Sequence, residues 1–210
     1  SLNPFAQYRN KLSTEDVLSS REVLWPLTLP MCSPIGDGAA AAIIISEKKA
    51  RQLGMSNLVK VEACALSSGY DYQPGTGIAP PRAGAVAIYE TAGIGPEDLS
   101  VVELHDASAI SEIMYYEYLG LCRPGEGGAM VDSGATTLGG KIPVNTSGGL
   151  MRKGHPVGAT GVSQLVELTW QLRGDAGERQ VPNASVALAE NGGGFIGQDV
   201  AALVLTLLSR

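Results

Sequence analysis

The sequence is poor in the residues that build metal sites and disulfide scaffolds. Its 210 residues include only two histidines and three cysteines. An odd number of cysteines without a CxxC spacing is typical of a reducing compartment, and a catalytic zinc site usually needs three protein ligands. We therefore expect no metal site and no disulfide framework, and a location in the cytoplasm or an organelle matrix.

Basic charge and long hydrophobic runs are also scarce. The 15 Lys and Arg residues are outnumbered by 21 Asp and Glu, for a net charge of −6, so no basic surface is available for nucleic-acid phosphates. The longest apolar stretches, residues 39–46 and 200–208, are far shorter than the roughly 20 residues that cross a bilayer. The chain begins at Ser1 without a signal-peptide pattern. We expect a processed or truncated product that binds neither nucleic acid nor membranes.

Short segments of strand and helix character alternate along the chain. Residues 1–38 are interrupted by prolines, with a capped helical turn expected after Ser13. Residues 39–46 form a continuous apolar run, typical of a strand buried on both faces. Further strands are expected over 58–67, 99–104, 185–190 and 200–205, and helices over 47–53, 81–92, 108–119 and 158–172. The alternation predicts an α/β fold in which a mixed sheet is covered by helices in α/β/α layers.

Two finer predictions concern the carboxyl-terminal third. The strands over 185–190 and 200–205 are expected to form a hairpin that turns at Gly192–Gly194. The helix over 158–172 is expected to bury one apolar face. The residues on that face are Val162, Leu165, Val166, Thr169 and Leu172.

Both histidines stand where a strand or loop leads into a helix. His105 lies at the carboxyl end of a strand, where ligands gather in α/β sheets, although His105 and Asp106 together are also suited to capping the next helix. His155 lies in a loop of small residues, 145–161. There a neutral imidazole is placed to take a proton from a thiol beside a helix amino terminus. The alternative, a phosphate-binding loop with an incidental histidine, lacks the GxxxxGK[ST] order.

Three motifs carry a resemblance to a known family. Glu103-Leu-His-Asp-Ala-Ser, Asn145-Thr-Ser-Gly-Gly-Leu and Gly154-His-Pro-Val-Gly-Ala-Thr-Gly resemble the thiolase superfamily, in particular the sterol-carrier-protein type of thiolase. The similarity runs from end to end but covers only the carboxyl-terminal half of a subunit built from two similar halves. It implies that residues 1–57 are a remnant of the amino-terminal half and that residues 58–210 are the carboxyl-terminal thiolase domain.

The resemblance also implies roles for site residues. His155 matches the histidine that activates the nucleophilic cysteine, which belongs to the amino-terminal half and which none of the three cysteines here matches. His105 matches a histidine that forms an oxyanion hole for the thioester oxygen together with His155. Gly192 and Gly193 match a second oxyanion hole. The remaining implied contacts, to the pantetheine arm of coenzyme A, fall on Ser147, Gly148 and Gly149, for which a glycine loop formed for packing is the alternative.

Two departures from the family pattern affect proton transfer. The second acid/base cysteine is replaced by Ala107, and the other position where thiolases keep such a cysteine is Glu190. We expect Glu190 to serve as the catalytic acid/base, with a water as one alternative. The side chains that remain as alternatives are Ser108, Tyr115, Tyr116 and Tyr118.

The resemblance implies that the chain is part of an acyl-CoA acyltransferase of lipid metabolism, a thiolase that cleaves or forms 3-oxoacyl-CoA and takes the coenzyme A thioester as substrate, with no other cofactor. The implied partners are the amino-terminal half and a second copy in a homodimer, and the chain alone is expected to be inactive. One alternative is a retro-aldol lyase that acts on a steroid or bulky side-chain CoA ester with a small OB-fold partner. The other is a non-catalytic lipid-binding subunit.

Overall fold

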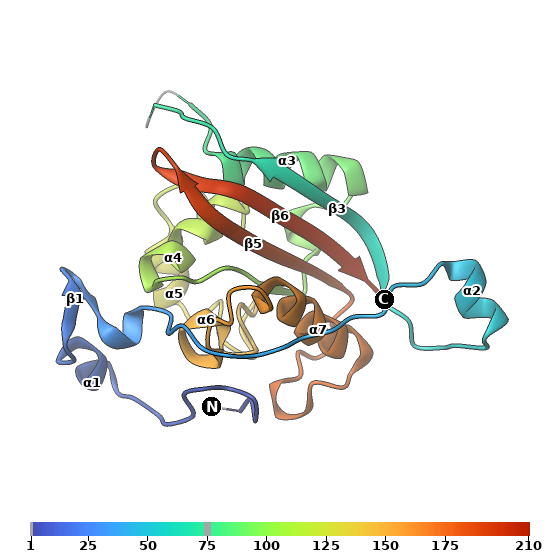
Figure 1. Ribbon diagram of the computed structural model, residues 1–210, viewed down its shortest axis with the longest axis horizontal. Helices are drawn as coiled ribbons and strands as arrows, with labels where there is room; N and C mark the ends of the chain where they lie inside the picture. Colours follow the sequence, from blue (N-terminus) through green and yellow to red (C-terminus); the bar gives the residue numbers. More distant parts are fainter. Residues whose placement is uncertain (1, 74–76) are drawn as a thin grey trace.

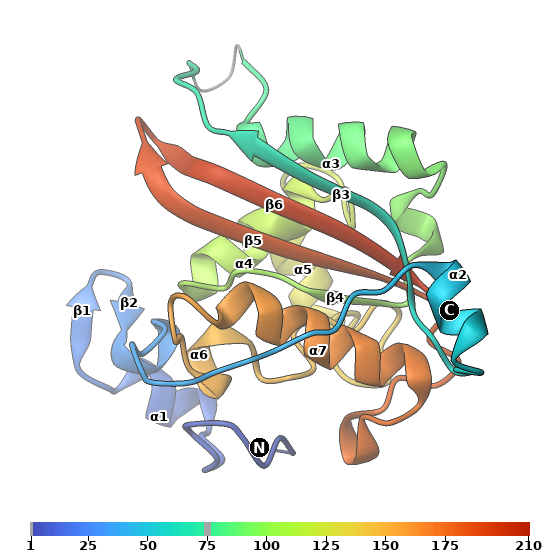
Figure 2. The same cartoon turned by 45° about the vertical axis from the view of Figure 1, so that its right-hand side comes forward.

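The fold is built around one mixed sheet. The computed structural model describes residues 2–73 and 77–210. Four strands lie in the order β3-β6-β5-β4 (Figures 1 and 2). Their bounds are β3 Lys60–Ser68, β6 Asp199–Ser209, β5 Val186–Ile196 and β4 Val101–Glu103. Strand β4 runs parallel to β5, whereas β6 runs antiparallel to both of its neighbours, β3 and β5. The predicted mixed sheet is confirmed.

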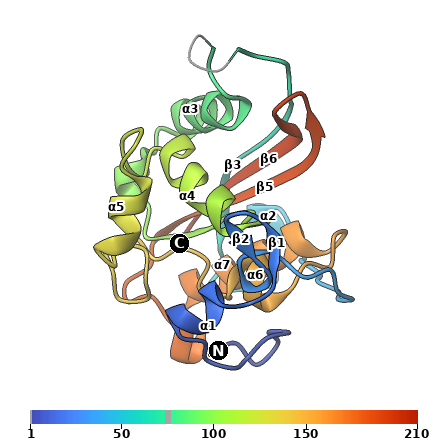
Figure 3. The same cartoon turned by 90° about the vertical axis from the view of Figure 1, so that its left-hand side faces the viewer.

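Helices cover both faces of this sheet. Figure 3 shows α3 (Pro80–Ala92) and α4 (Ala109–Tyr118) on one side and α7 (Thr160–Arg173) on the other. Side chains alternate along β5, so Leu188 packs among the α3 and α4 residues while Ala187 and Ala189 pack against α7. The predicted α/β/α layers are therefore confirmed.

The remaining elements are short. They are α1 (Thr14–Leu18), β1 (Glu22–Leu24), β2 (Leu27–Thr28), η1 (Leu29–Met31), α2 (Glu47–Gln52), η2 (Pro96–Asp98), α5 (Gly127–Asp132), α6 (Gly149–Lys153) and η3 (Gly177–Arg179). Over residues 2–73 and 77–210, no helix has the length and apolar character needed to cross a membrane.

Local capping signals fix the helix boundaries much as the sequence predicts. The Ser13 hydroxyl accepts a hydrogen bond from the Asp16 backbone N–H, and the Asp16 carboxylate accepts one from Ser13, so α1 begins with a capping box. Helix α3 begins with two prolines and ends at Gly93, whose left-handed φ of 65° a residue with a Cβ adopts only with strain.

The strand predicted over residues 39–46 is wrong. This segment has no regular structure and pairs with no strand among the described residues, and Ile43 and Ile44 are 93% and 81% exposed. It runs along α7 towards α2, which projects from the rest of the chain (Figures 1 and 2). An apolar run becomes a buried strand only where neighbouring strands satisfy its backbone groups, and the described chain supplies none here.

The predicted buried face of α7 is also wrong, although the helix itself is present. Of the five residues expected there only Leu172 is buried, and it shares the buried face with Gln164, Glu167, Leu168 and Gln171. These polar side chains are fully hydrogen-bonded, which removes the usual cost of burying them.

The carboxyl-terminal hairpin exists, but its turn lies elsewhere. Gly192, Gly193 and Gly194 belong to β5, and the chain reverses at Gly197 and Gln198, between Ile196 and its partner Asp199. Both strands have 11 residues, longer than expected. The glycine triplet is therefore part of the sheet surface.

Candidate active site

The two histidines meet at one cavity. The rings of His105 and His155 lie edge to face, with their centroids 5.0 Å apart and their planes at 86°. His105 comes just after β4 and His155 just after α6. Both line a cavity of about 480 Å³. Its other lining residues are Ala107, Ser111, Met114, Tyr115, Tyr118, Val157, Asn191–Phe195 and Gln198–Val200.

The amino-terminal segment holds the two histidine-bearing loops in register. The backbone N–H of Ser33 donates to the Ala107 carbonyl at 3.0 Å, and the backbone N–H of His155 donates to the Pro34 carbonyl at 3.0 Å. Gly36 in turn donates to the His155 carbonyl. One short extended stretch thus bridges the loop after β4 and the loop after α6, which are about 50 residues apart in the sequence.

The His155 ring is held by a hydrogen bond at Nδ1. This nitrogen lies 2.8 Å from the Thr160 hydroxyl oxygen. When the Thr160 hydroxyl donates its proton to the Pro156 carbonyl at 3.2 Å, Thr160 Oγ1 accepts from the imidazole and Nε2 keeps its lone pair. Burial and the positive charge of Lys153 lower the pKa of His155 below its ordinary value. A neutral imidazole with a free Nε2 is the form that takes up a proton.

His105 is more deeply buried than His155. Burial, together with the charge of His155, lowers the pKa of His105 to about 4, so this imidazole is neutral at pH 7. Its backbone N–H donates to Glu190 Oε2 at 2.8 Å, and its ring Nδ1 lies 3.2 Å from Asn191 Nδ2. Two consecutive β5 residues therefore hold the main chain and the ring of His105.

Asp106 does cap a helix, but not the one that follows it. Its carboxyl oxygens accept the backbone N–H groups of Leu150 at 2.6 Å and Met151 at 3.3 Å, at the start of α6. Helix α4 is capped by the Ser108 hydroxyl, which accepts from the Ser111 N–H. Asp106 thus ties the loop that carries His105 to the helix that precedes His155.

The structure places Glu190 outside the cavity. Its side chain is 0% exposed. It extends from β5 to the side opposite Asn191, where Oε2 accepts the His105 N–H and Oε1 lies beside the Tyr115 hydroxyl. Burial raises its pKa to about 8. Glu190 does not line the cavity itself, although Tyr115 and Gly192, which lie close to its carboxyl group, do. Its role as the acid/base stays a prediction.

Among the alternative acid/base groups, two tyrosines line the cavity. Tyr115 and Tyr118 both do so, whereas the Tyr116 hydroxyl donates to Glu112 at 2.6 Å and Ser108 is engaged in capping α4. Burial raises the pKa of Tyr115 and of Tyr118 above the ordinary value, so both hydroxyls keep their protons at pH 7.

The glycine pair expected to form an oxyanion hole borders the cavity beside the histidines. A Cβ at Gly192 would lie 2.7 Å from Val200 Cγ1 and 2.9 Å from the Tyr115 hydroxyl, so a larger residue there would displace one of these side chains. At Gly193 nothing lies within 4 Å, and the backbone is open to the cavity. Their role in binding an oxygen stays a prediction.

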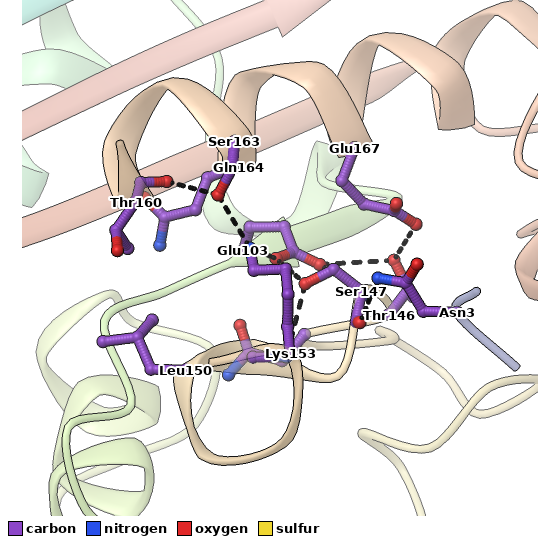
Figure 4. A network of polar contacts seen from close by, with 12 residues as sticks. Asn3, Glu103, Thr146, Ser147, Leu150, Lys153, Thr160, Ser163, Gln164 and Glu167 are labelled. Carbon is purple, nitrogen blue, oxygen red and sulfur yellow. Dashed lines mark hydrogen bonds and ion pairs between the residues drawn. The ribbon is translucent and has the colours of Figure 1, made fainter. Parts of the chain in front are cut away.

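The loop expected to contact coenzyme A is mostly committed to packing. Ser147 is buried and hydrogen-bonds to Glu103 through its hydroxyl at 2.6 Å and its backbone N–H at 2.9 Å. Figure 4 shows this pair beneath α7, where Lys153 and Glu167 complete the network. Gly149 is also buried, whereas Gly148 lines a separate cavity of about 510 Å³. The packing alternative accounts for Ser147 and Gly149.

Neither a thiol nor a metal cluster is found in the site. Cys32 and Cys122 are half-buried and Cys64 is exposed on β3, and none of the three lines the cavity. Within residues 2–73 and 77–210, no group of three or more His, Cys, Asp or Glu side chains is arranged to hold a metal ion.

Comparison with known proteins identifies the family. Residues 71–206 match the family described as "Thiolase C-terminal domain-like". This chain belongs to the thiolase family. It is 44% identical over 198 residues to rabbit (Oryctolagus cuniculus) "Sterol carrier protein 2", which covers 90% of this chain and 36% of the relative. It is 43% identical over 198 residues to "Acetyl-CoA acetyltransferase" of Methanothermobacter thermautotrophicus, covering 92% of this chain and 51% of the relative.

The fold is shared with a solved structure. The "Ltp2-ChsH2(DUF35) aldolase" superimposes with a TM-score of 0.82 at 24% identity, covering 98% of this chain and 54% of that one. The thiolase-like fold predicted from the motifs is therefore confirmed. This thiolase-family chain spans about a third to a half of the length of the curated relatives it matches.

Two polar residues at the site were not predicted from the sequence. Asn191 lines the cavity and contacts the His105 ring, and the buried Gln164 contacts Asn191 from α7. Asn191 lies one residue beyond the predicted strand over 185–190, and Gln164 is one of several polar residues of α7. No apolar pattern therefore distinguished either residue from its neighbours.

Proposed function

We propose that this chain forms the histidine-bearing wall of a thiolase-family enzyme that makes or breaks a carbon–carbon bond next to a coenzyme A thioester. The supporting observation is the convergence of His105 and His155, 5.0 Å apart at one cavity. Bond cleavage leaves an electron pair on the thioester, as an enolate oxygen. His105, as a hydrogen-bond donor, and His155, once it has accepted a proton, can stabilise that oxygen within a partly buried site.

In the acyltransferase reaction a cysteine outside these 210 residues attacks the 3-oxo carbon of the substrate. His155 Nε2 first accepts the thiol proton. The bond between C2 and C3 then breaks, the acyl group stays on sulfur, and the enolate of the shortened thioester accepts a proton. Free coenzyme A finally takes the acyl group from the cysteine. The relative "Acetyl-CoA acetyltransferase" supports this reaction class.

Two features of this chain support the proposal that a further thiolase half completes the enzyme. None of its three cysteines lines the cavity. Ile43 and Ile44 are exposed in an unpaired apolar segment, and Leu66 on β3 is 75% exposed. Covering these side chains would remove apolar surface from water, at roughly 25 cal/mol per Å². An amino-terminal thiolase half is the partner we propose for this surface; dimerisation stays a prediction.

A retro-aldol lyase is the second candidate, and one observation favours it. Ala107 stands where thiolases carry an acid/base cysteine, and no cysteine of the chain lines the cavity in its place. A lyase needs no nucleophilic cysteine, since a base removes the proton of the 3-hydroxyl group and the C2–C3 bond breaks to release an aldehyde or ketone. The solved relative is itself named an aldolase with a DUF35 partner.

Product analysis separates the two reactions. The chain, assembled with an amino-terminal thiolase half, is incubated with a 3-oxoacyl-CoA plus free coenzyme A, and separately with a 3-hydroxyacyl-CoA alone. An acyltransferase yields two acyl-CoA products in the first mixture only. A lyase yields an aldehyde or ketone in the second only.

Variants connect either activity to the site. His155→Ala is expected to reduce kcat at least 100-fold, the usual contribution of a general base. Cys64→Ala, at an exposed position on β3 away from the cavity, serves as the matched control and retains full activity. If neither substrate turns over in the assembled enzyme, or if the isolated chain is fully active without a partner, the proposal fails, and the first of these results favours the non-catalytic lipid-binding alternative.

A further inference from the structure

A chain of side-chain amides runs from the core to the His105 ring. Gln164 Nε2 donates to the Glu190 backbone carbonyl at 2.9 Å. Gln164 Oε1 lies 3.3 Å from Asn191 Nδ2, and the same Asn191 nitrogen lies 3.2 Å from His105 Nδ1. Gln164 is 0% exposed and Asn191 is half-buried, so water competes weakly for these bonds.

The direction of every bond in this chain is fixed by its first member. A backbone carbonyl only accepts, so the Gln164 amide must present its nitrogen to Glu190 and its oxygen to Asn191. Asn191 must then present its nitrogen to Gln164, and the second hydrogen of that nitrogen is directed at His105. His105 Nδ1 is left as the acceptor, and the ring proton resides on Nε2.

We propose that Asn191 and Gln164 are positioning residues that hold His105 in the tautomer with its proton on Nε2. In this form His105 directs a hydrogen-bond donor away from β5, while His155, with its proton on Nδ1, directs a lone pair from Nε2. The two imidazoles thus have complementary roles, one as donor to an oxyanion and the other as base. Their use in turnover rests on the proposed function, but the tautomers themselves do not.

Packing holds the Asn191 amide in place. A Cβ at Gly161, in the first turn of α7, would lie 3.3 Å from Asn191 Cγ, so the helix backbone lies directly against the amide. On its other sides the amide contacts Gln164 and the His105 ring. Flipping the amide would bring its oxygen against Gln164 Oε1, and this repulsion opposes the flip.

Nitrogen NMR tests the tautomers directly. This chain has only two histidines, so ¹⁵N labelling of the imidazoles gives four nitrogen signals, which His155→Gln assigns. In the wild-type chain at pH 7, without substrate, we expect His105 to carry its proton on Nε2. In Asn191→Asp a carboxylate of the same shape only accepts, so the proton should move to Nδ1 and the pKa of His105 should rise by about 1–3 units.

A matched variant and a second position complete the test. Asn183→Asp makes the same chemical change at an exposed turn residue and should leave both histidine spectra unchanged. Gln164→Met removes the anchor of Asn191 and should give a mixture of His105 tautomers, which keeps the test informative if Asn191→Asp does not fold. A wild-type proton on Nδ1, or wild-type spectra in both folded variants, overturns the proposal.

The same variants are then assayed in the assembled enzyme. Asn191→Asp should lower kcat more than it changes KM, and the acid limb of the pH profile should move to higher pH. If turnover is absent in every form while the NMR result holds, the proposed function fails and the positioning role stands. If turnover is present and the tautomers do not respond to Asn191, the positioning role fails alone.

Discussion

Replacing Gly149 with alanine should destabilise the chain far more than the same change at an open glycine. Gly149 is buried at the start of α6 with φ +58°, and an added Cβ would lie 2.2 Å from Asp106 Oδ2 and 2.6 Å from Asp106 Cγ. The Asp106 carboxyl cannot simply move aside, because it is itself hydrogen-bonded to the backbone N–H groups of Leu150 and Met151. The cap of α6 must therefore break.

Two contributions set the size of the effect. Placing an alanine in the left-handed region costs about 1–2 kcal/mol. Displacing the Asp106 carboxyl leaves buried polar groups unsatisfied, which costs about 1–3 kcal/mol more. We expect Gly149→Ala to reduce the free energy of unfolding by about 2–5 kcal/mol in total.

Gly177→Ala is the matched control. Gly177 has φ +60° with nothing within 4 Å of an added Cβ, so it reports the backbone contribution alone, about 1–2 kcal/mol. Both variants are unfolded in urea and followed by circular dichroism, and the wild type gives the reference midpoint. Equal losses in the two variants would refute the assignment of Gly149 to packing against Asp106, and would restore a direct role for this glycine in ligand contact.

Two further predictions concern buried charge. Because burial lowers the pKa of His105 from 6.5 to about 4, the unfolded chain binds a proton on this imidazole at higher pH than the folded chain does, and the free energy of unfolding should fall as the pH drops from 6.5 towards 4. His105→Gln, measured by urea unfolding across that range, should make the free energy of unfolding depend less steeply on pH. An unchanged dependence would contradict this cause. Arg179 forms a 2.7 Å ion pair with Glu167 at a buried site, so Arg179→Met should lower the free energy of unfolding by about 3–5 kcal/mol. The control Arg51→Met removes an exposed pair with Glu47 and should lower it by at most about 0.5 kcal/mol. Similar losses in the two variants would show that the Arg179 pair is not buried in solution.

Features that depend on neighbouring residues in the sequence were predictable. The capping of α1 at Ser13, the proline start of α3 and the stop at Gly93 all follow from local backbone chemistry. The placement of His105 follows from the short apolar run directly before it, which predicts the strand that is found as β4. In each case the residues that determine the feature lie within a few positions of one another in the sequence, the range over which backbone propensity and helix capping act.

Features that depend on distant partners were not predictable in the same way. Residues 39–46 have the composition of a buried strand, but pairing depends on which strands lie beside them. Glu190 is bonded through its side chain to the backbone N–H of His105, 85 residues away in the sequence. Such a long-range contact depends on the register of the sheet, which a motif does not specify.

The buried polar face of α7 serves both the fold and the site, because the same side chains pack in the core and orient the two histidines. Thr160 and Gln164 are four residues apart and share that face. Thr160 sets the ring of His155 directly, and Gln164 sets the ring of His105 through Asn191. A rotation of α7 would therefore disturb the contacts of both imidazoles. An apolar face would have packed the helix equally well against β5, but it would have left each ring free to choose its own orientation and tautomer.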